Sequence, residues 1–183
     1  MGLSRLVTIF AICLLPALAD AVQVQINITR PFVYIQIGHG QFGSFGLFGP
    51  PTNLVDEVAF SFPPGVTPGD GTPIVGTPVM PVALLGYRGG RRVRFTVTMN
   101  STVPLNNGNG NTLPFNEISW TTRDGDVPGG RFSQGAAQTL MSLNINWPRG
   151  RGVIDYLTFR YDNDTVYAPG TYTGRVVYTI TQL

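Results

Sequence analysis

The sequence predicts an all-β protein folded as an antiparallel β-sandwich, and three observations support this prediction. Short segments alternate apolar and polar residues with a period of two, which is typical of strands that bury one face. The 23 glycines and 15 prolines lie mostly between these segments, where they favour turns. No long segment repeats its apolar residues at helical spacing. Many short strands with frequent turns are expected to pack as two sheets around one core.

Residues 1–21 have the organisation of a secretory signal peptide. A lone Arg5 precedes an apolar run from Leu6 to Leu15, and small residues follow this run. The run is short for a membrane span, which needs about 20 residues. Cleavage is expected after Ala19 or after Ala21. The mature chain would then have about 160 residues, a length that suits one domain.

Charge and cysteine content exclude several classes of function. Charged residues make up 12% of the chain and the net charge is +2, which is too little to indicate nucleic-acid binding. The single cysteine, Cys13, lies in the expected signal peptide, so the mature chain has neither a disulfide nor a reactive thiol. Every basic residue is an arginine, which excludes a catalytic lysine.

Strands are expected throughout the first half of the mature chain. Residues 22–30 (VQVQINITR) alternate cleanly and end before a proline. Pro81 indicates that its strand lies at the edge of a sheet, because proline has no N–H to donate to a neighbouring strand. The strands expected after residue 30 are Phe32–Ile37, Val58–Phe62, Val79–Tyr87 and Arg92–Met99.

The second half continues the same pattern. The Asn-Gly repeats at 106–111 predict a hairpin loop, and residues 123–137 are expected as a longer loop. The expected strands are Asn116–Thr122, Thr139–Trp147, Val153–Tyr161 and residues 170–183. This succession predicts an immunoglobulin-like β-sandwich over residues 31–183, either complete or lacking its last strand. A β-barrel is the alternative.

Candidates for catalysis and metal binding are few. His39 is the only histidine and lies in a Gly-rich loop with no carboxylate nearby in the sequence, so we expect a loop histidine and no catalytic residues. Two acidic pairs, Asp124 with Asp126 and Asp162 with Asp164, could offer oxygen ligands to Ca²⁺. Aspartate, asparagine and glycine are also the residues that turns prefer. We therefore expect turns, with no metal and no cofactor.

Basic and aromatic residues offer two candidate binding surfaces. The two tryptophans, Trp120 and Trp147, lie in alternating strands and are expected in the core rather than on a sugar-binding face. One local group of arginines could bind acidic glycans, but arginines on a strand also discourage edge-to-edge aggregation, which is the interpretation we favour. This group comprises Arg88, Arg91, Arg92 and Arg94.

The first and last expected strands are the most informative features. Both alternate strongly, as VQVQINITR at 22–30 and GTYTGRVVYTITQL at 170–183. A sandwich that lacks one strand exposes apolar core and unpaired backbone groups, which are costly to leave unsatisfied. A strand from another chain can fill such a groove. If each subunit fills the groove of the next, the head-to-tail contact does not close and a filament results.

These two segments resemble those of the pilin-type subunits of bacterial chaperone–usher fimbriae. Such subunits typically end in G-x-Y-x-G-x-V-x-V/Y-T, with the first glycine near the fourteenth position from the end, and here 13 residues follow Gly170. The front segment, VQVQINITRPFVYIQI, resembles cysteine-free subunits of the colonisation-factor and cable-pilus class, and the spore-coat-U-like pilins are related. The resemblance implies a donor strand carrying Val22, Val24, Ile26 and Ile28. It implies a groove-edge strand carrying Gly170, Tyr172, Gly174, Val176, Tyr178 and Ile180.

The resemblance also implies a function and partners. The protein would be exported through the periplasm, bind a periplasmic chaperone and an outer-membrane usher, and polymerise with copies of itself or sister subunits by donor-strand exchange. The resulting cell-surface fimbrium would support adhesion or biofilm formation, without nucleic acid or a small-molecule cofactor. Two alternatives stay open: a stand-alone secreted β-sandwich that binds carbohydrates or surfaces, and a secreted hydrolase on a β scaffold.

Overall fold

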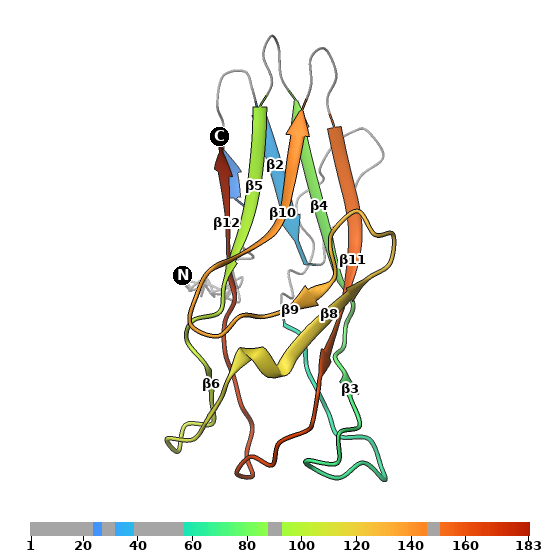
Figure 1. Cartoon of the computed structure of the whole chain (residues 1–183), viewed down its shortest axis with the longest axis vertical. Coiled ribbons are helices and arrows are strands. Elements are labelled where there is room, and N and C mark those ends of the chain that lie inside the picture. Colours follow the sequence, from blue (N-terminus) through green and yellow to red (C-terminus); the bar gives the residue numbers. More distant parts are fainter. Residues whose placement is uncertain (1–23, 27–31, 39–56, 88–92, 146–150) are drawn as a thin grey trace, which may run out of the picture.

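The protein is an antiparallel all-β protein, as predicted, with two main sheets packed face to face (Figure 1). The computed structural model describes residues 24–26, 32–38, 57–87, 93–145 and 151–183. Within these residues, no helix is long and apolar enough to cross a membrane.

The larger sheet has the strand order β1-β2-β4-β11-β8-β9, and β3 pairs with β11 outside this path. A short 3₁₀ turn, η1 (Phe115–Glu117), leads directly into β8. The strands are β1 (Val24–Ile26), β2 (Phe32–Ile37), β3 (Ile74–Val75), β4 (Met80–Tyr87), β8 (Ile118–Thr122), β9 (Gly130–Arg131) and β11 (Arg151–Tyr161).

The smaller sheet has three strands in the order β10-β5-β12, and β5 is the central one. Its strands are β10 (Gln138–Ile145), β5 (Val93–Asn100) and β12 (Val177–Gln182). A separate hairpin of two short strands, β6 (Leu105–Asn106) and β7 (Thr112–Leu113), carries the Asn-Gly loop that the sequence predicts. In Figure 1 the smaller sheet lies in front of the larger one, and the hairpin lies below it.

The core lies between the two sheets and follows the period of two. On β5 every second side chain is at most 5% exposed, whereas the residues between them are exposed or half-buried. Trp120 is 5% exposed and its ring lies 5.1 Å from that of Phe132, which confirms the predicted core position of Trp120. Phe132 in turn stacks on Phe159 with 5.9 Å between ring centroids. Trp147 lies outside the described residues.

The expectation that Pro81 marks an edge strand is wrong. β4 lies between β2 and β11 in the interior of the larger sheet. The carbonyl of Pro81 accepts a hydrogen bond from Gly38, one residue beyond the end of β2. The nitrogen of Pro81 faces the same side, because both backbone groups of a residue in an antiparallel strand point to one neighbour. The N–H that proline lacks would therefore lie beyond the last residue pair of the β2–β4 ladder, so no hydrogen bond of that ladder is lost.

Three other expectations about strands need correction. Residues 58–62 form no strand, since only Ala59 makes a single bridge, to Thr77. The tail is regular only over β12, whereas residues 170–176 make one isolated bridge. The short strands β3 and β9 lie in segments expected as turn and loop. Two-residue strands are too short to give an alternation, so pairing with a neighbour alone defines them.

Candidate functional site

Among the residues that the structure describes, β12 ends its sheet and has one paired strand. Its partner there is β5, in register from Val177 opposite Asn100 to Gln182 opposite Phe95. The next pair, Leu183 and Arg94, exchanges two backbone hydrogen bonds of 2.8 and 3.3 Å. Because such pairs alternate along an antiparallel ladder, the backbone groups of Gln182 and its second neighbour Ile180 point away from β5. They define the edge at which a further strand could add.

The side chains of β12 cover the core only in part. Val176, Tyr178 and Ile180 pack against the main core cluster, and each remains half-buried. On the opposite face Val177 is 52% exposed. Among the described residues, β12 therefore presents an apolar face that is buried only in part.

β12 has none of the charges, prolines or bulges that usually prevent another strand from pairing with an edge strand. Residues 177–182 (VYTITQ) contain no charge and no proline, and their register with β5 is continuous. The other edge strand of the same sheet, β10, has a register shift between Thr139 and Met141. Bulges, charges and prolines blunt sheet edges in most β proteins. The regular and uncharged edge of β12 is thus the better template for strand addition.

The segment before β12 is anchored on the β6–β7 hairpin, and its glycines make this possible. The amide and carbonyl of Thr173 exchange hydrogen bonds of 3.0 and 2.8 Å with Asn106. A Cβ atom at Gly174 would lie 2.9 Å from a side-chain carbon of Leu105, and one at Gly170 would lie 3.2 Å from the amide nitrogen of Asn107. Close approach to the hairpin therefore requires glycine at both positions.

Tyr172, between these glycines, fills a second cluster of apolar side chains. It lies with Tyr167 in a T-shaped contact of 6.5 Å, beside Ile74 and Tyr161. Its hydroxyl donates to the carbonyl of Ala168 at 2.8 Å. The G-x-Y-x-G part of the tail thus holds the chain on the hairpin, and only the part after it forms the edge strand.

The predicted donor strand is described over three residues. Val24 and Ile26 lie in β1, which pairs with β2 at the edge of the larger sheet, with Val24 opposite Ile35. Val22 and Ile28 lie outside the described residues. Ile35 belongs to the same core cluster as Ile180 of β12, so β2, next to the end strand of the described larger sheet, and β12, which ends the described smaller sheet, border one core.

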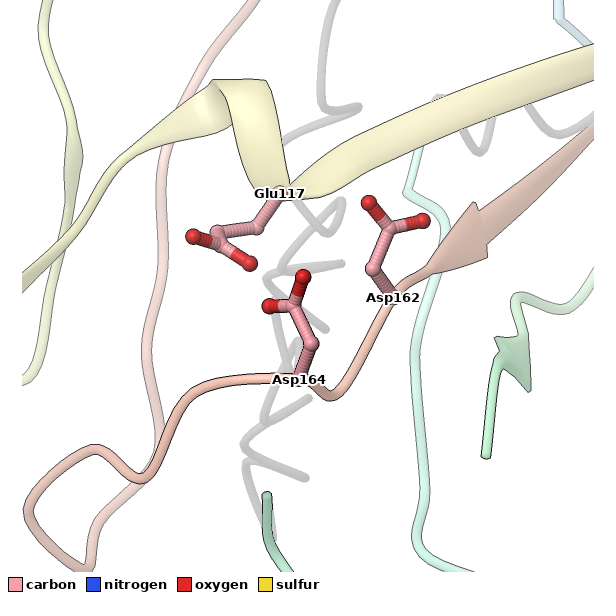
Figure 2. Close-up of side chains that lie close together, drawn as sticks. All are labelled: Glu117, Asp162 and Asp164. Atoms are coloured by element: carbon pink, nitrogen blue, oxygen red, sulfur yellow. The ribbon is translucent and has the colours of Figure 1, made fainter. Parts of the chain in front are cut away.

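A second candidate site is a group of three carboxylates, shown in Figure 2. Glu117 ends η1, and Asp162 and Asp164 follow β11; one oxygen atom of each lies within 4.8 Å of the others. The sequence had pointed to the two aspartates but not to Glu117, because nothing in the local pattern brings η1 to the end of β11. The backbone N–H of Asp162 donates to the carbonyl of Glu117 at 2.9 Å, which fixes this approach.

Protein groups already partner all three carboxylates, and the Thr165 hydroxyl donates to Asp164 at 3.2 Å. Arg131 forms an ion pair with Asp162, and the Tyr167 hydroxyl donates to Glu117 at 3.0 Å. Burial raises the pKa of Glu117, and the nearby Asp164 raises it further, although the Tyr167 hydroxyl acts in the opposite direction. Burial, together with the hydrogen bond to Glu117, raises the pKa of Tyr167 to about 12. The group has the ligand types of a cation site, but its contacts are those of a structural network that ties the β11–β12 connection to η1.

The other predicted acidic pair is not brought together with a further ligand in the described residues. Asp124 and Asp126 lie in the β8–β9 loop, which a buried aspartate organises. Asp155 is fully buried and accepts four backbone hydrogen bonds of 2.7 to 3.0 Å. Their donors are Arg123, Asp124, Val127 and Tyr156.

The charge of Asp155 is stabilised although the residue is buried. Burial alone would raise the pKa of Asp155, but the four N–H donors outweigh this effect and hold the pKa below its ordinary value. Sequence reasoning missed this role, although Asp155 alternates in phase with Val153 and Leu157, and this phase could have indicated a buried aspartate. Of the remaining predicted residues, Arg94 is exposed on β5, and His39, Arg88, Arg91 and Arg92 lie outside the described residues.

Comparison with protein-family models, with curated proteins and with solved structures finds no match to this chain.

Proposed function

We propose that this protein is a structural fimbrial subunit of pilin-like type, which polymerises by donor-strand exchange. The observation that carries the proposal is the edge of β12. This strand is regular and uncharged, pairs only with β5 among the described residues, and leaves Val176 and Ile180 half-buried over the core. An added strand would bury this apolar margin and satisfy backbone groups at once.

The occupant that fits this edge is the N-terminal strand of another copy. Residues 22–30 alternate with a period of two, so Val22, Val24, Ile26 and Ile28 would all face the core when the strand lies beside β12. Among the described residues of the single chain, β1 pairs with β2 over three residues. Donation to a neighbour would require the loss of this pairing.

Export and partners follow from the same proposal. A free and uncharged strand edge is a hazard for aggregation before assembly, so a protein that supplies a temporary strand is needed. The resemblance to chaperone–usher pilins suggests a periplasmic chaperone in this role and an outer-membrane usher for assembly. The product would be a surface filament that supports adhesion or biofilm formation.

The first test supplies the proposed donor strand as a separate peptide to a domain that lacks it. The mature domain without residues 22–30 is melted alone and with a synthetic VQVQINITR peptide. At a peptide concentration of 100 times Kd, a ligand of the folded state alone stabilises it by about 2.7 kcal/mol, so the melting temperature should rise clearly. A peptide of the same length with aspartate in place of its apolar residues is the control and should have no effect. A stable monomer that ignores both peptides would instead favour the stand-alone binding sandwich.

A matched pair of variants locates the groove in the mature chain of residue 22 onward. Ile180→Arg places a charge on the face of β12 that covers the core, whereas Val177→Arg places the same charge on the opposite face, which is 52% exposed. We expect Ile180→Arg to abolish the growth of oligomers measured by light scattering, and Val177→Arg to retain it. Equal assembly of both variants would exclude the β12 edge as the acceptor.

A further inference from the structure

The loop between β6 and β7 contains two Asn-Gly pairs in tandem, Asn107-Gly108 and Asn109-Gly110. Asparagine before glycine is the sequence most prone to spontaneous deamidation, because a glycine without a Cβ atom lets its backbone nitrogen approach the preceding side chain. Both glycines have positive φ angles, 78° and 86°, and nothing lies within 4 Å of where a Cβ atom would be. The local sequence thus makes both asparagines candidates, and the structure distinguishes them.

Asn107 is held in place. Its side-chain oxygen accepts the backbone N–H groups of Asn109 and Asn111 at 2.9 and 3.2 Å. Its side-chain nitrogen is buried and lies against Gly170. The backbone N–H of Gly108, which would have to attack, donates instead to the side chain of Asn106. Both reacting groups of the first pair are therefore engaged.

The second pair, Asn109 and Gly110, is not held by such hydrogen bonds. Both residues are exposed. Among the hydrogen bonds of the described residues, none involves the side chain of Asn109 or the backbone N–H of Gly110. The side chain can rotate toward that nitrogen without breaking a hydrogen bond that the structure describes.

We propose that Asn109 is a site of spontaneous deamidation in the folded protein and that Asn107 is protected. The backbone nitrogen of Gly110 forms a bond to the side-chain carbonyl carbon of Asn109, the bond to the side-chain nitrogen breaks, and ammonia leaves. Water then opens the cyclic imide to give aspartate or isoaspartate at position 109. No oxidant, enzyme or cofactor takes part. The inference is independent of the proposed function.

The modification would place a negative charge at the tip of the hairpin that anchors the tail. Asn106, at the base of the same loop, exchanges two backbone hydrogen bonds with Thr173. Stored protein would then be a mixture of molecules with and without a negative charge at position 109, close to the Asn106–Thr173 hydrogen bonds.

The test compares the two asparagines in the folded and the unfolded protein. The mature chain is incubated at mildly alkaline pH with and without denaturant, and peptide mapping by mass spectrometry measures the rate at each position. In denaturant the two rates should be nearly equal, because glycine follows both residues. In the folded protein Asn109 should react at least about tenfold faster than Asn107, as the bonds that hold Asn107 predict.

Equal rates in the folded protein, or faster reaction at Asn107, would overturn the proposal. The variant Asn109→Gln provides the control, since its side chain is one methylene longer and closes the ring poorly. It should lose the main product of the folded protein while its melting temperature stays unchanged, because the side chain of Asn109 is exposed and makes no hydrogen bond among the described residues. An undiminished yield of deamidated folded protein in this variant would likewise contradict the assignment.

Discussion

At one side of the sandwich the chain crosses directly from β9 in the larger sheet to β10 in the smaller one, whereas at the other side β12 and β1 end their sheets without a described strand between them. On the first side Phe132, 3% exposed, begins the crossing and stacks on Phe159. On the second side Ile180 of β12 stays half-buried. We refer to these as the closed side and the open side.

The burial of an edge strand depends on the neighbouring segments that cover its apolar side chains. Ile145 on β10 and Ile180 on β12 are the same residue type, and both strands pair with β5. Ile145 is 1% exposed and packs over Gly86 of β4. The apolar alternation of the two strands is alike, so the difference in burial arises from what each strand packs against: Ile145 lies over β4 of the larger sheet, whereas β12 ends the described part of its sheet.

The largest effect should come from truncating these two isoleucines. Ile145→Ala should lower the free energy of unfolding by about 2–5 kcal/mol, because it leaves a cavity in a closed core. Ile180→Ala should cost only about 1–2 kcal/mol in the monomer, since less apolar area is removed from the interior. Urea unfolding of both variants measures the difference, and equal losses would mean that the two sides are equally closed.

On the closed side, Asp155→Asn should lower stability by about 2–3 kcal/mol near neutral pH, because hydrogen bonds to a charged acceptor are lost. The pKa of Asp155 is below its ordinary value in the folded protein. Its contribution is therefore present above the unfolded pKa of about 3.9 and is lost as the pH falls through the folded pKa. Unfolding followed from neutral to acid pH should show the two proteins converging, and a constant gap would contradict this role.

On the open side, Gly174→Ala should cost about 1–3 kcal/mol, because the new Cβ would lie 2.9 Å from Leu105 and 3.0 Å from Phe115. The matched control is Gly152→Ala on β11, where the nearest atom would lie 3.5 Å away in ordinary contact. Hydrogen exchange of the tail should increase in the first variant alone. Similar exchange in both would show that the hairpin does not anchor the tail.

The smallest effect is expected at Glu117, which helps to tie the β11–β12 connection. Its raised pKa, caused chiefly by burial, means that its contribution is present below the unfolded pKa of about 4.3 and is lost as the pH rises through the folded pKa. Glu117→Gln, which stays neutral, should add less than about 1 kcal/mol at neutral pH and nothing at acid pH. Thermal unfolding of the variant at both pH values measures this change in stability. A lower melting temperature of Glu117→Gln at neutral pH would contradict the prediction.

The candidate site was predictable where it depends on local alternation. The tail residues from Val176 to Ile180 were predicted as a strand, and β12 begins at Val177. The anchoring of Gly170 and Gly174 on the hairpin was not predictable, since it depends on a contact with residues far away in the sequence. Of the three carboxylates, the sequence indicates Asp162 and Asp164 as a pair, whereas Glu117 joins them only through folding.

Local patterns are enough to predict the fold class, because a period of two is a property of single strands and glycine or proline marks the turns between them. They also predict which faces are apolar, as the alternation on β5 shows. The tertiary structure was needed to place Pro81 inside a sheet, to bring four backbone N–H groups to Asp155, and to show that β12 ends its sheet among the described residues. The reason is physical: strand order and hydrogen-bond partners are set by distant segments, and an alternating strand carries no record of which neighbour it will meet.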